Sequence, residues 1–424
     1  MYLFCVRHFN DIDHIAPIVW KMKQGNYPVA VYCISPKYDI DADYRLRFLK
    51  EQGVMVEFIY NAFDQKLNAF HHTMRYLFLR LSANRKKSNS HAQEKISLLT
   101  RLSQVTETII GRIVYELTKT GFYQTNWAHY LLEKSEAQAL CFDHILPSRY
   151  VVNVLLKAAK KKYIPTIALP HGVYLYTNTF NKVKFSSRQR FYKFNRFDYV
   201  VVQNHLRKDV LVRSGIASEK IFVLGSARFC REWIDQNKKI LPRNIEPTGR
   251  DSKKLRVVFM PSKPRCRIDV ERMNNTIDLL ASLSEIEAVV KPHTRIGREA
   301  HLFHNMRLPD VSHVLTSELC EWADVVLIIG SSVITEVLMQ GKPVLYLKYL
   351  HANRMLFEDC GACWTIHNEA ELEQALQSLR KESMDVPYGD ENVNRFLLEV
   401  VYGGQNNRDV LKDYVQFITN CSVH

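Results

Sequence analysis

Cysteine is sparse in this sequence and lacks the spacing of a metal site or a disulfide framework. Nine cysteines are spread over 424 residues. One close pair, Cys360 and Cys363 in a Cys-Gly-Ala-Cys run, has no second pair to match it. A structural zinc site or a disulfide scaffold is therefore disfavoured. Reduced thiols in a cytosolic compartment fit this usage best.

The sequence also lacks the segments that direct a chain into a membrane. Its first residues do not show the basic start and apolar run of a signal peptide. No window approaches the roughly 18 consecutive apolar residues of a transmembrane helix. We therefore expect a cytoplasmic protein, either soluble or bound peripherally to the inner face of the cell membrane.

Acidic residues are too few to balance the basic ones. Asp and Glu total 44 against 58 Lys and Arg, which gives a formal net charge of +14. Such a surface favours anionic partners: nucleotide diphosphates, acidic polysaccharide, nucleic acid or an anionic membrane leaflet. The motifs must decide among these partners.

Alternating strand and helix patterns open the chain. Apolar strands are expected at 2–6, 29–34 and 54–60, with helices at 14–24 and 41–52 between them. This order predicts a doubly wound α/β sheet. The loop after the first strand lacks Gly-x-Gly-x-x-Gly, so the usual dinucleotide site is not expected there.

The length of the chain predicts more than one domain. The best linker is 236–254, which is polar and charged and contains both Pro and Gly. It separates an N-terminal domain, 1–235, from a C-terminal domain, 255–405, and a last helix at 406–424 follows. A helical insertion at about 65–135 has a basic run that fits either a solvated tip or contact with an anionic membrane.

Two buried strands in the C-terminal half end in polar turns. Residues 288–290 and 325–329 are short β-branched runs, typical of parallel strands, and a further strand is expected near 313–315. Ligands of α/β proteins bind at the carboxyl edge of the sheet. The residues expected at this edge are Lys291, His293 and Arg295 after the first run and Gly330, Ser331 and Ser332 after the second.

The second of these turns has the spacing of a nucleotide site. A helix should begin at Ser331 or Ser332, and its free N–H groups would bind an anion. Glu336 lies one turn deeper on the same face. An anion on the serine amides and a polyol on Glu336 would lie roughly 5–6 Å apart, as phosphate and ribose do in a nucleotide. Ser262 and Lys263, after an earlier strand, belong to a cationic turn that would suit a pyrophosphate, and plain surface charge is the alternative.

The pairing of Lys-Pro-His-Thr-Arg at 291–295 with Gly-Ser-Ser-Val-Ile-Thr-Glu at 330–336 resembles the donor-binding half of GT-B transferases. It is most similar to CDP-glycerol glycerophosphotransferases and to CMP-Kdo and CMP-sialate transferases of bacterial surface polysaccharide synthesis. These enzymes carry a Pro-His or His-Pro turn and a downstream Ser-Ser turn in this order. The sequence departs from the sialate and Kdo pattern because no proline follows His293. The resemblance covers about 198–347.

This resemblance implies two Rossmann-like domains facing across a cleft. It implies a glycosyltransferase that moves a sugar from a nucleotide donor, preferably CMP- or CDP-linked, to an oligosaccharide or lipid-linked acceptor of a cell-surface polysaccharide. Transfer of a polyol phosphate in capsule or teichoic acid synthesis is the alternative. No cofactor is expected besides the donor. His293, with Lys291, Arg295 and the serine amides, would stabilise the leaving phosphate without a metal.

A histidine in the N-terminal half is the candidate base. His171 and Gly172 follow a strand at 165–169, and the glycine lets the backbone approach a ligand closely. In glycerophosphotransferases a His-Gly turn lies in the cleft, and its histidine is implicated as general base on the acceptor hydroxyl. The resemblance gives this role to His171. A histidine that only binds loop backbone is the alternative.

Other polar side chains follow strands of the N-terminal sheet, where GT-B enzymes bind the acceptor. For the four in the loop after the first strand, His8, Asp11, Asp13 and His14, a polar loop with an N-cap for the first helix is the alternative. Two Asp-x-Asp triplets, at 11–13 and 41–43, do not follow a clear buried strand, so no metal site is expected. The candidates on the acceptor side are His8, Asp11, Asp13, His14, Asp143, His144 and Gly172.

Two other functions remain open from the sequence. A UDP-sugar 2-epimerase shares the fold and the donor site, but it needs catalytic carboxylates around the sugar, and the N-terminal loops show no convincing set. A nucleic-acid or membrane-binding protein would explain the charge, and it predicts binding that weakens steeply with salt. We expect no nucleic-acid partner, because the two turns favour a nucleotide.

Overall fold

The computed structural model describes residues 1–35, 38–59, 61, 126–143, 150–178, 193–243, 254–262, 268–293, 307–381 and 385–422. Most of the expected helical insertion lies outside these residues, as do the candidates His144, Lys263 and Arg295. Within the described stretches, no helix combines the length and the apolar character needed to cross a membrane.

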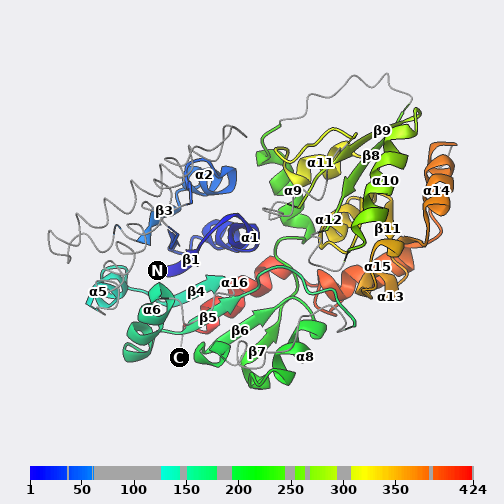
Figure 1. Ribbon diagram of the computed structural model, residues 1–424. Helices are drawn as coiled ribbons and strands as arrows, with labels where there is room; N and C mark the ends of the chain where they lie inside the picture. Colours follow the sequence, from blue (N-terminus) through cyan, green and yellow to red (C-terminus); the bar gives the residue numbers. More distant parts are fainter. Residues whose placement is uncertain are drawn as a thin grey trace, which may run out of the picture.

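The N-terminal half folds around a sheet of seven parallel strands (Figure 1). In spatial order they are β3 (Met55–Phe58), β2 (Val29–Cys33), β1 (Tyr2–Val6), β4 (Ala139–Asp143), β5 (Thr166–Leu169), β6 (Tyr199–Val202) and β7 (Ile221–Val223). The chain fills one side of β1 first and then the other. A topological switch point, where α/β sheets bind ligands, therefore lies between β1 and β4.

Helices cover both faces of this sheet. They are α1 (Phe9–Gln24), α2 (Tyr44–Glu51), α5 (Asn126–Lys134), α6 (Tyr150–Lys161), α8 (His205–Arg213) and α9 (Arg231–Ile240), with 3-10 turns η2 (Lys193–Arg196) and η3 (Ser218–Lys220). Alternate residues of β1 enter different cores because strand side chains alternate between faces. Phe4 and Val6 pack on the α1 side, whereas Leu3 and Cys5 pack on the side of α5 and α6. Burial on both faces explains why β1 and β2 are continuous apolar runs.

The C-terminal half is built on five parallel strands. Their order is β12 (Trp364–Ile366), β11 (Val344–Leu347), β10 (Val325–Ile328), β8 (Leu255–Met260) and β9 (Ile286–Val290). The accompanying helices are α10 (Val270–Ser282), α11 (Thr316–Trp322), α12 (Val333–Met339), α13 (Leu356–Asp359) and α14 (Glu369–Lys381), with the 3-10 turn η6 (Lys348–Leu350). The switch point of this sheet lies between β8 and β10.

The first helix begins within the stretch that we expected to be a polar loop. His8 is its N-cap residue and has an extended backbone. The carboxylate of Asp11 accepts the backbone N–H of Arg7 at 2.8 Å, which ties the end of β1 to the first turn of α1. Asp11, Asp13 and His14 therefore lie on a helix, and Asp11 is fully buried.

Two further expectations about secondary structure were wrong. The stretch 313–315 is not a strand: it forms a turn before α11, and the parallel bridge to Val290 is made by Asp310 instead. The stretch 236–254 is not linker throughout, because α9 continues to Ile240. The helix keeps an amphipathic pattern there, with Trp233, Ile234 and Asn237 buried, despite its many charged residues.

The C-terminus returns to the N-terminal sheet. The helix α15 (Asp390–Val400) leads into α16 (Val410–Asn420), which packs against α1 and lies beside the N-terminal sheet (Figure 1). The hydroxyl of Tyr414 donates to the carbonyl of Gly225 at 2.9 Å, and the N–H of Ser226 donates to the carbonyl of Val401 at 2.8 Å. The loop after β7 is thus the docking point for the chain that joins the two halves.

Gly225 should be essential for this docking. Its φ is +80°, and a Cβ added there would lie 2.2 Å from the carbonyl oxygen of Val401. Gly225→Ala should lower the free energy of unfolding by about 2–5 kcal/mol through backbone strain and overpacking. Gly341→Ala is the matched control, because Gly341 has φ +68° and open space around the added atom. It should cost only about 1–2 kcal/mol. Equal losses in urea denaturation would contradict tight docking.

Candidate active site

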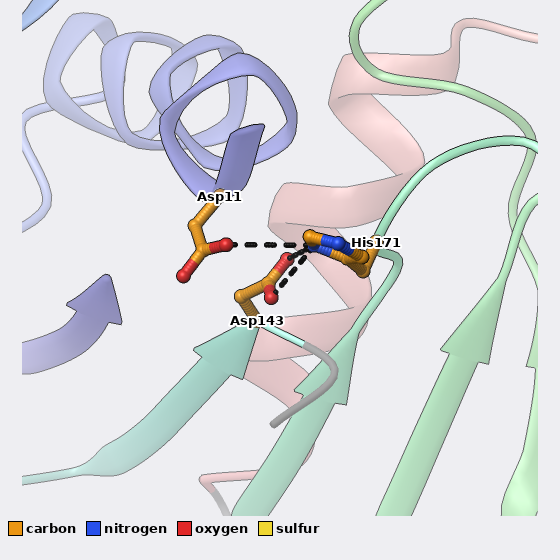
Figure 2. Close-up of side chains that lie close together, drawn as sticks. All are labelled: Asp11, Asp143 and His171. Carbon is orange, nitrogen blue, oxygen red and sulfur yellow. Dashed lines mark hydrogen bonds and ion pairs between the residues drawn. The ribbon is translucent and has the colours of Figure 1, made fainter. Parts of the chain in front are cut away.

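Two carboxylates and an imidazole converge at the switch point of the N-terminal sheet (Figure 2). Asp143 ends β4, His171 follows β5, and Asp11 lies in the first turns of α1. Nδ1 of His171 lies 2.9 Å from Oδ2 of Asp143 and 3.4 Å from Oδ1 of Asp11. The sequence predicted all three residues at this edge, and the structure brings them into direct contact.

Arg7 neutralises the two carboxylates. Its Nε lies 2.8 Å from Oδ2 of Asp11, and its Nη2 lies 2.6 Å from Oδ2 of Asp143. Both carboxylates are completely buried. Burying such charges is costly unless each is paired and hydrogen-bonded. With His171 protonated, the four groups carry two positive and two negative charges, so the cluster is neutral as a whole.

The cluster changes the protonation of His171. Burial works to lower its pKa, but hydrogen bonds to Asp11 and Asp143 outweigh burial and raise the pKa to about 9. Burial raises the pKa of Asp143 to about 7, against the hydrogen bond from His171. Burial also acts to raise the pKa of Asp11, but bonds from His171 and Arg7 hold it low. His171 is therefore a cation at neutral pH.

The geometry leaves one nitrogen of His171 for a ligand. Because Nδ1 is bonded to the carboxylates, Nε2 is the nitrogen that can exchange a proton with a bound molecule. The side chain is 27% exposed. The next residue, Gly172, has φ +77° and no heavy atom within 4 Å of an added Cβ. The loop that carries His171 is held against α1, since the N–H of Gly172 donates to Nε2 of His14 at 3.0 Å.

The remaining candidates on the acceptor side have other partners. The ring of His14 is buried, and burial lowers its pKa well below the usual value, so it is a neutral acceptor. His8 lies at the rim, 42% exposed, with Nδ1 3.2 Å from Oδ1 of Asp11. Asp13 is paired with the buried Arg45 and lies 2.9 Å from Nη1 of Arg228. Asp13 thus acts in the packing of α1 and does not join the His171 cluster.

The donor-side turns lie at the switch point of the C-terminal sheet. Oγ of Ser262, after β8, donates to the carbonyl of Ile329 at 3.3 Å and joins the ends of β8 and β10. The helix α12 starts at Val333, with Ser332 as its N-cap residue, and Oγ of Ser331 accepts the N–H of Val333 at 3.3 Å. Gly330 precedes this turn with φ +96°.

Glu336 lies on α12 one turn beyond Ser332, as the sequence predicted, and is 5% exposed. Burial raises the pKa of its carboxyl, and the positive charge of Arg228 acts against that rise. Arg228 belongs to the loop after β7 and also contacts Asp13. The charge of Arg228 therefore acts both on Asp13 of the first half and on Glu336 of the second.

The cationic side chains expected beside β9 are arranged differently from each other. Nζ of Lys291 is buried and donates to the carbonyl of Ser312 at 3.2 Å and to the carbonyl of Val314. Burial lowers the pKa of this amine. Lys291 thus holds the turn at 313–315, the stretch we had expected to be a strand. His293 is half-buried at the end of the same segment.

The ligand atoms of Asp11, Asp143 and His171 lie within 4.8 Å of one another, a spacing that a metal ion could use. The guanidinium of Arg7, however, bonds both carboxylates. A divalent cation would have to displace this guanidinium, and the three groups are better described as an ion-pair cluster.

A cavity of about 1350 Å³ lies away from both switch points. Asp324 and Pro343, which line it, precede β10 and β11, so it lies at the amino ends of these strands. Its cationic groups are engaged: Nζ of Lys342 donates to the carbonyl of Ala323 at 2.6 Å, and Nε of Arg408 lies 2.8 Å from Asp413. None of the predicted site residues lines this cavity.

Sequence reasoning missed Arg7 and Arg228. Arg7 carries the signal that singled out His8, a polar side chain directly after a buried strand. Arg228 lies in the loop between β7 and α9, where no motif of the sequence pointed to it. A pairing with Asp13 across more than two hundred residues leaves no local pattern in the sequence.

No protein-family model and no curated protein sequence matches this chain. Solved structures do match it over nearly its whole length. The UDP-GlcNAc 2-epimerase from Methanocaldococcus jannaschii has 14% identity and a TM-score of 0.56, covering 99% of this chain and 100% of that one. The UDP-GlcNAc 2-epimerase from Neisseria meningitidis, bound to UDP-GlcNAc, has 11% identity and a TM-score of 0.52, covering 100% of both chains.

The wall teichoic acid polymerase TagF is similar at 14% identity and a TM-score of 0.50, covering 100% of this chain and 88% of that one. At such identities the likeness shows the architecture. This chain has the GT-B fold. The expectation of two Rossmann-like units, which the resemblance to GT-B transferases implied, is thereby confirmed.

The ion-pair cluster should be visible in the titration of His171. NMR should give a pKa of about 9 for its imidazole, against an ordinary value of 6.5. Asp143→Asn should bring the pKa down towards 6.5, because it removes the nearest carboxylate. Asp41→Asn, which removes an exposed carboxylate paired with Lys50, should leave it unchanged.

The same shift predicts how stability depends on pH. The pKa of His171 is raised in the folded state. The stabilisation of the fold by its ion pairs is therefore fully present below pH 6.5 and is lost as pH rises through about 9. A wild-type pKa near 6.5, or a D143N variant with an unchanged pKa, would contradict this description.

Proposed function

We propose that this chain is a metal-independent GT-B glycosyltransferase. It would move a sugar from a nucleotide donor, preferably a cytidine nucleotide, to the acceptor of a bacterial cell-surface polysaccharide. The observation that carries this proposal is His171, held through Nδ1 by buried carboxylates with Nε2 left for a ligand. This is the arrangement of a general base or acid.

In the proposed reaction, an acceptor hydroxyl oxygen forms a bond to the anomeric carbon of the donor. The bond from that carbon to the nucleotide phosphate oxygen breaks, and the hydroxyl proton passes to Nε2 of His171. The imidazolium that forms is stabilised by Asp143 and Asp11, which hold the ring in place. Transfer of a polyol phosphate would use the same base, with attack at phosphorus.

The leaving nucleotide would be bound at the other switch point. Glu336 would accept hydrogen bonds from the ribose hydroxyls, and the turn at 330–332 would face the phosphate. His293 and the cationic residues expected after β8 and β9 would stabilise its charge. Glu336 is the main support for this placement, since it is a buried carboxylate one turn beyond the Ser331-Ser332 turn.

Nucleotide binding should depend on Glu336. A thermal-shift screen with CMP, CDP, UDP, UMP and GDP should identify a nucleotide that raises the melting temperature, because a ligand of the folded state stabilises it. Glu336→Gln should weaken binding of that nucleotide by roughly tenfold, the value of one charge-assisted hydrogen bond. The control variant Glu369→Gln removes a carboxylate of α14 that is bonded to Arg272 of α10, and it should bind the nucleotide as the wild type does. A screen in which no nucleotide stabilises the protein would contradict the proposal.

The role of His171 should appear in the pH dependence of transfer. A base with a pKa of about 9 gives kcat/KM values that rise with pH up to that value. Asp143→Asn should move this limb to lower pH and lower the plateau by about 10²-fold, since the ring loses its orientation. A rate that instead falls above pH 9 would show that His171 acts as an acid.

A UDP-sugar 2-epimerase is the second candidate. It is favoured by the carboxylates of Asp11 and Asp143 at the switch point and by the similar fold of epimerases, one of which is bound to UDP-GlcNAc. Both carboxylates are completely buried and bonded to Arg7, which disfavours their acting directly on a sugar. Incubation with UDP-N-acetylglucosamine alone distinguishes the two functions, because an epimerase forms a new sugar isomer without any acceptor.

A further inference from the structure

A short strap from the His171 loop pairs with the C-terminal half. Residues 175–178 run beside residues 352–356, and the backbone N–H of Thr177 donates to the carbonyl of Arg354 at 3.0 Å. The strap begins only a few residues after His171. The pairing therefore joins the segment that carries His171, the candidate catalytic residue, to the C-terminal half.

His351 directly precedes 352–356, the stretch of the C-terminal half that takes part in this pairing. It follows β11 and the turn η6, and its ring lies beside Gly330, whose added Cβ would be 3.5 Å from Cε1. Nδ1 of His351 accepts the backbone N–H of Asn353 at 3.3 Å, so the neutral ring carries its proton on Nε2. Burial and the charge of Lys348 lower the pKa of this histidine to about 4, so the ring is neutral at physiological pH.

The Nε2–H group of His351 has no hydrogen-bond partner among the described residues, although the side chain is only 7% exposed. An unsatisfied buried donor costs about 1–3 kcal/mol, so native proteins seldom keep one without a reason. The strap contributes two more such atoms, Oγ1 of Thr177 and Oδ1 of Asn178. Two unsatisfied polar atoms thus belong to the strap and a third to His351, which directly precedes the paired stretch 352–356 and adjoins the Gly330 turn.

The chemistry of these atoms indicates the group that they bind. His351 offers a donor, Asn178 an acceptor, and Thr177 a hydroxyl that can do either. A phosphate oxygen can satisfy the donor but not the acceptor. A sugar or polyol hydroxyl satisfies both, because it accepts one hydrogen bond and donates another.

We propose that His351, together with Thr177 and Asn178, binds hydroxyl groups of the sugar or polyol that the nucleotide carries. This subsite rests on the proposed function, since it presumes a nucleotide-activated donor at the Gly330 turn. Because the strap carries both Thr177 and, a few residues earlier, His171, binding of the transferred group there would align it with the catalytic base. The subsite would therefore distinguish the intact donor from the free nucleotide.

The test compares nucleotides with and without the transferred group. Calorimetric titrations would use UDP against UDP-N-acetylglucosamine, and CDP against CDP-glycerol, with the pair that binds wild-type protein carried forward. His351→Asn keeps an acceptor at the position of Nδ1 and removes the Nε2 donor. It should weaken binding of the intact donor roughly tenfold and change binding of the free nucleotide less than twofold. His351→Gln, which keeps an N–H at the position of Nε2, should recover most of the loss.

Thr177→Val supplies an independent variant. The change is nearly isosteric, and because Oγ1 lacks a partner, the melting temperature should stay the same or rise. Binding of the intact donor should still fall several-fold. Unchanged donor binding in both H351N and T177V would overturn the proposal and leave water as the occupant of these groups. An equal loss for donor and free nucleotide in H351N would overturn it as well, by placing His351 on the nucleotide.

The proposed function can fail separately from this subsite. If wild-type protein binds neither of these pairs and no nucleotide of the thermal-shift screen stabilises it, the transferase function fails and the subsite fails with it. If Glu336→Gln weakens both members of a pair while the variants at 351 and 177 weaken neither, the nucleotide site stands and the subsite alone is wrong.

Discussion

The pairing of two completely buried carboxylates with one guanidinium and one imidazole determines the geometry of the N-terminal site. Asp11 and Asp143 come from α1 and β4, and neither charge could be buried without Arg7 and His171. The cost of leaving any of these charges unpaired fixes the start of α1 against the ends of β1 and β4. It also fixes the ring of His171, so that its second nitrogen faces away from the carboxylates. The geometry of the candidate active site and the local stability thus have the same origin.

The two halves of the chain are connected on several sides of this site. The strap at 175–178 pairs with 352–356, and α16 docks on the loop after β7. Arg228, from that same loop, pairs with Asp13 and acts electrostatically on Glu336. These contacts join the candidate base to the donor half through short lengths of backbone.

The sequence predicted the architecture well because buried parallel strands have a strong local signature. β1 has the predicted bounds, and the Ser331-Ser332 turn precedes Glu336 by one helical turn as expected. The start of α1 was missed because Asp11 looks like a loop residue until Arg7 and His171 neutralise it. The stretch 313–315 looked like a strand, but it forms a turn in which the carbonyl of Val314 accepts a hydrogen bond from the amine of Lys291. Local patterns do not record tertiary contacts. They could therefore not predict the ion pairs of Arg7 and Arg228, nor that Nε2 of His351 is buried without a partner among the described residues.

The central claim is that one nucleotide-linked molecule spans both switch points, with its ribose on Glu336 and its reacting end at His171. A crystal structure of the inactive His171→Asn variant in complex with an intact nucleotide-linked donor tests it most directly. We expect the ribose hydroxyls within hydrogen-bond distance of Glu336, the phosphate at the turn 330–332, and the transferred group between residue 171 and His351. A nucleotide bound instead in the cavity lined by Lys342 and Arg408, with the Glu336 carboxylate untouched, would contradict it.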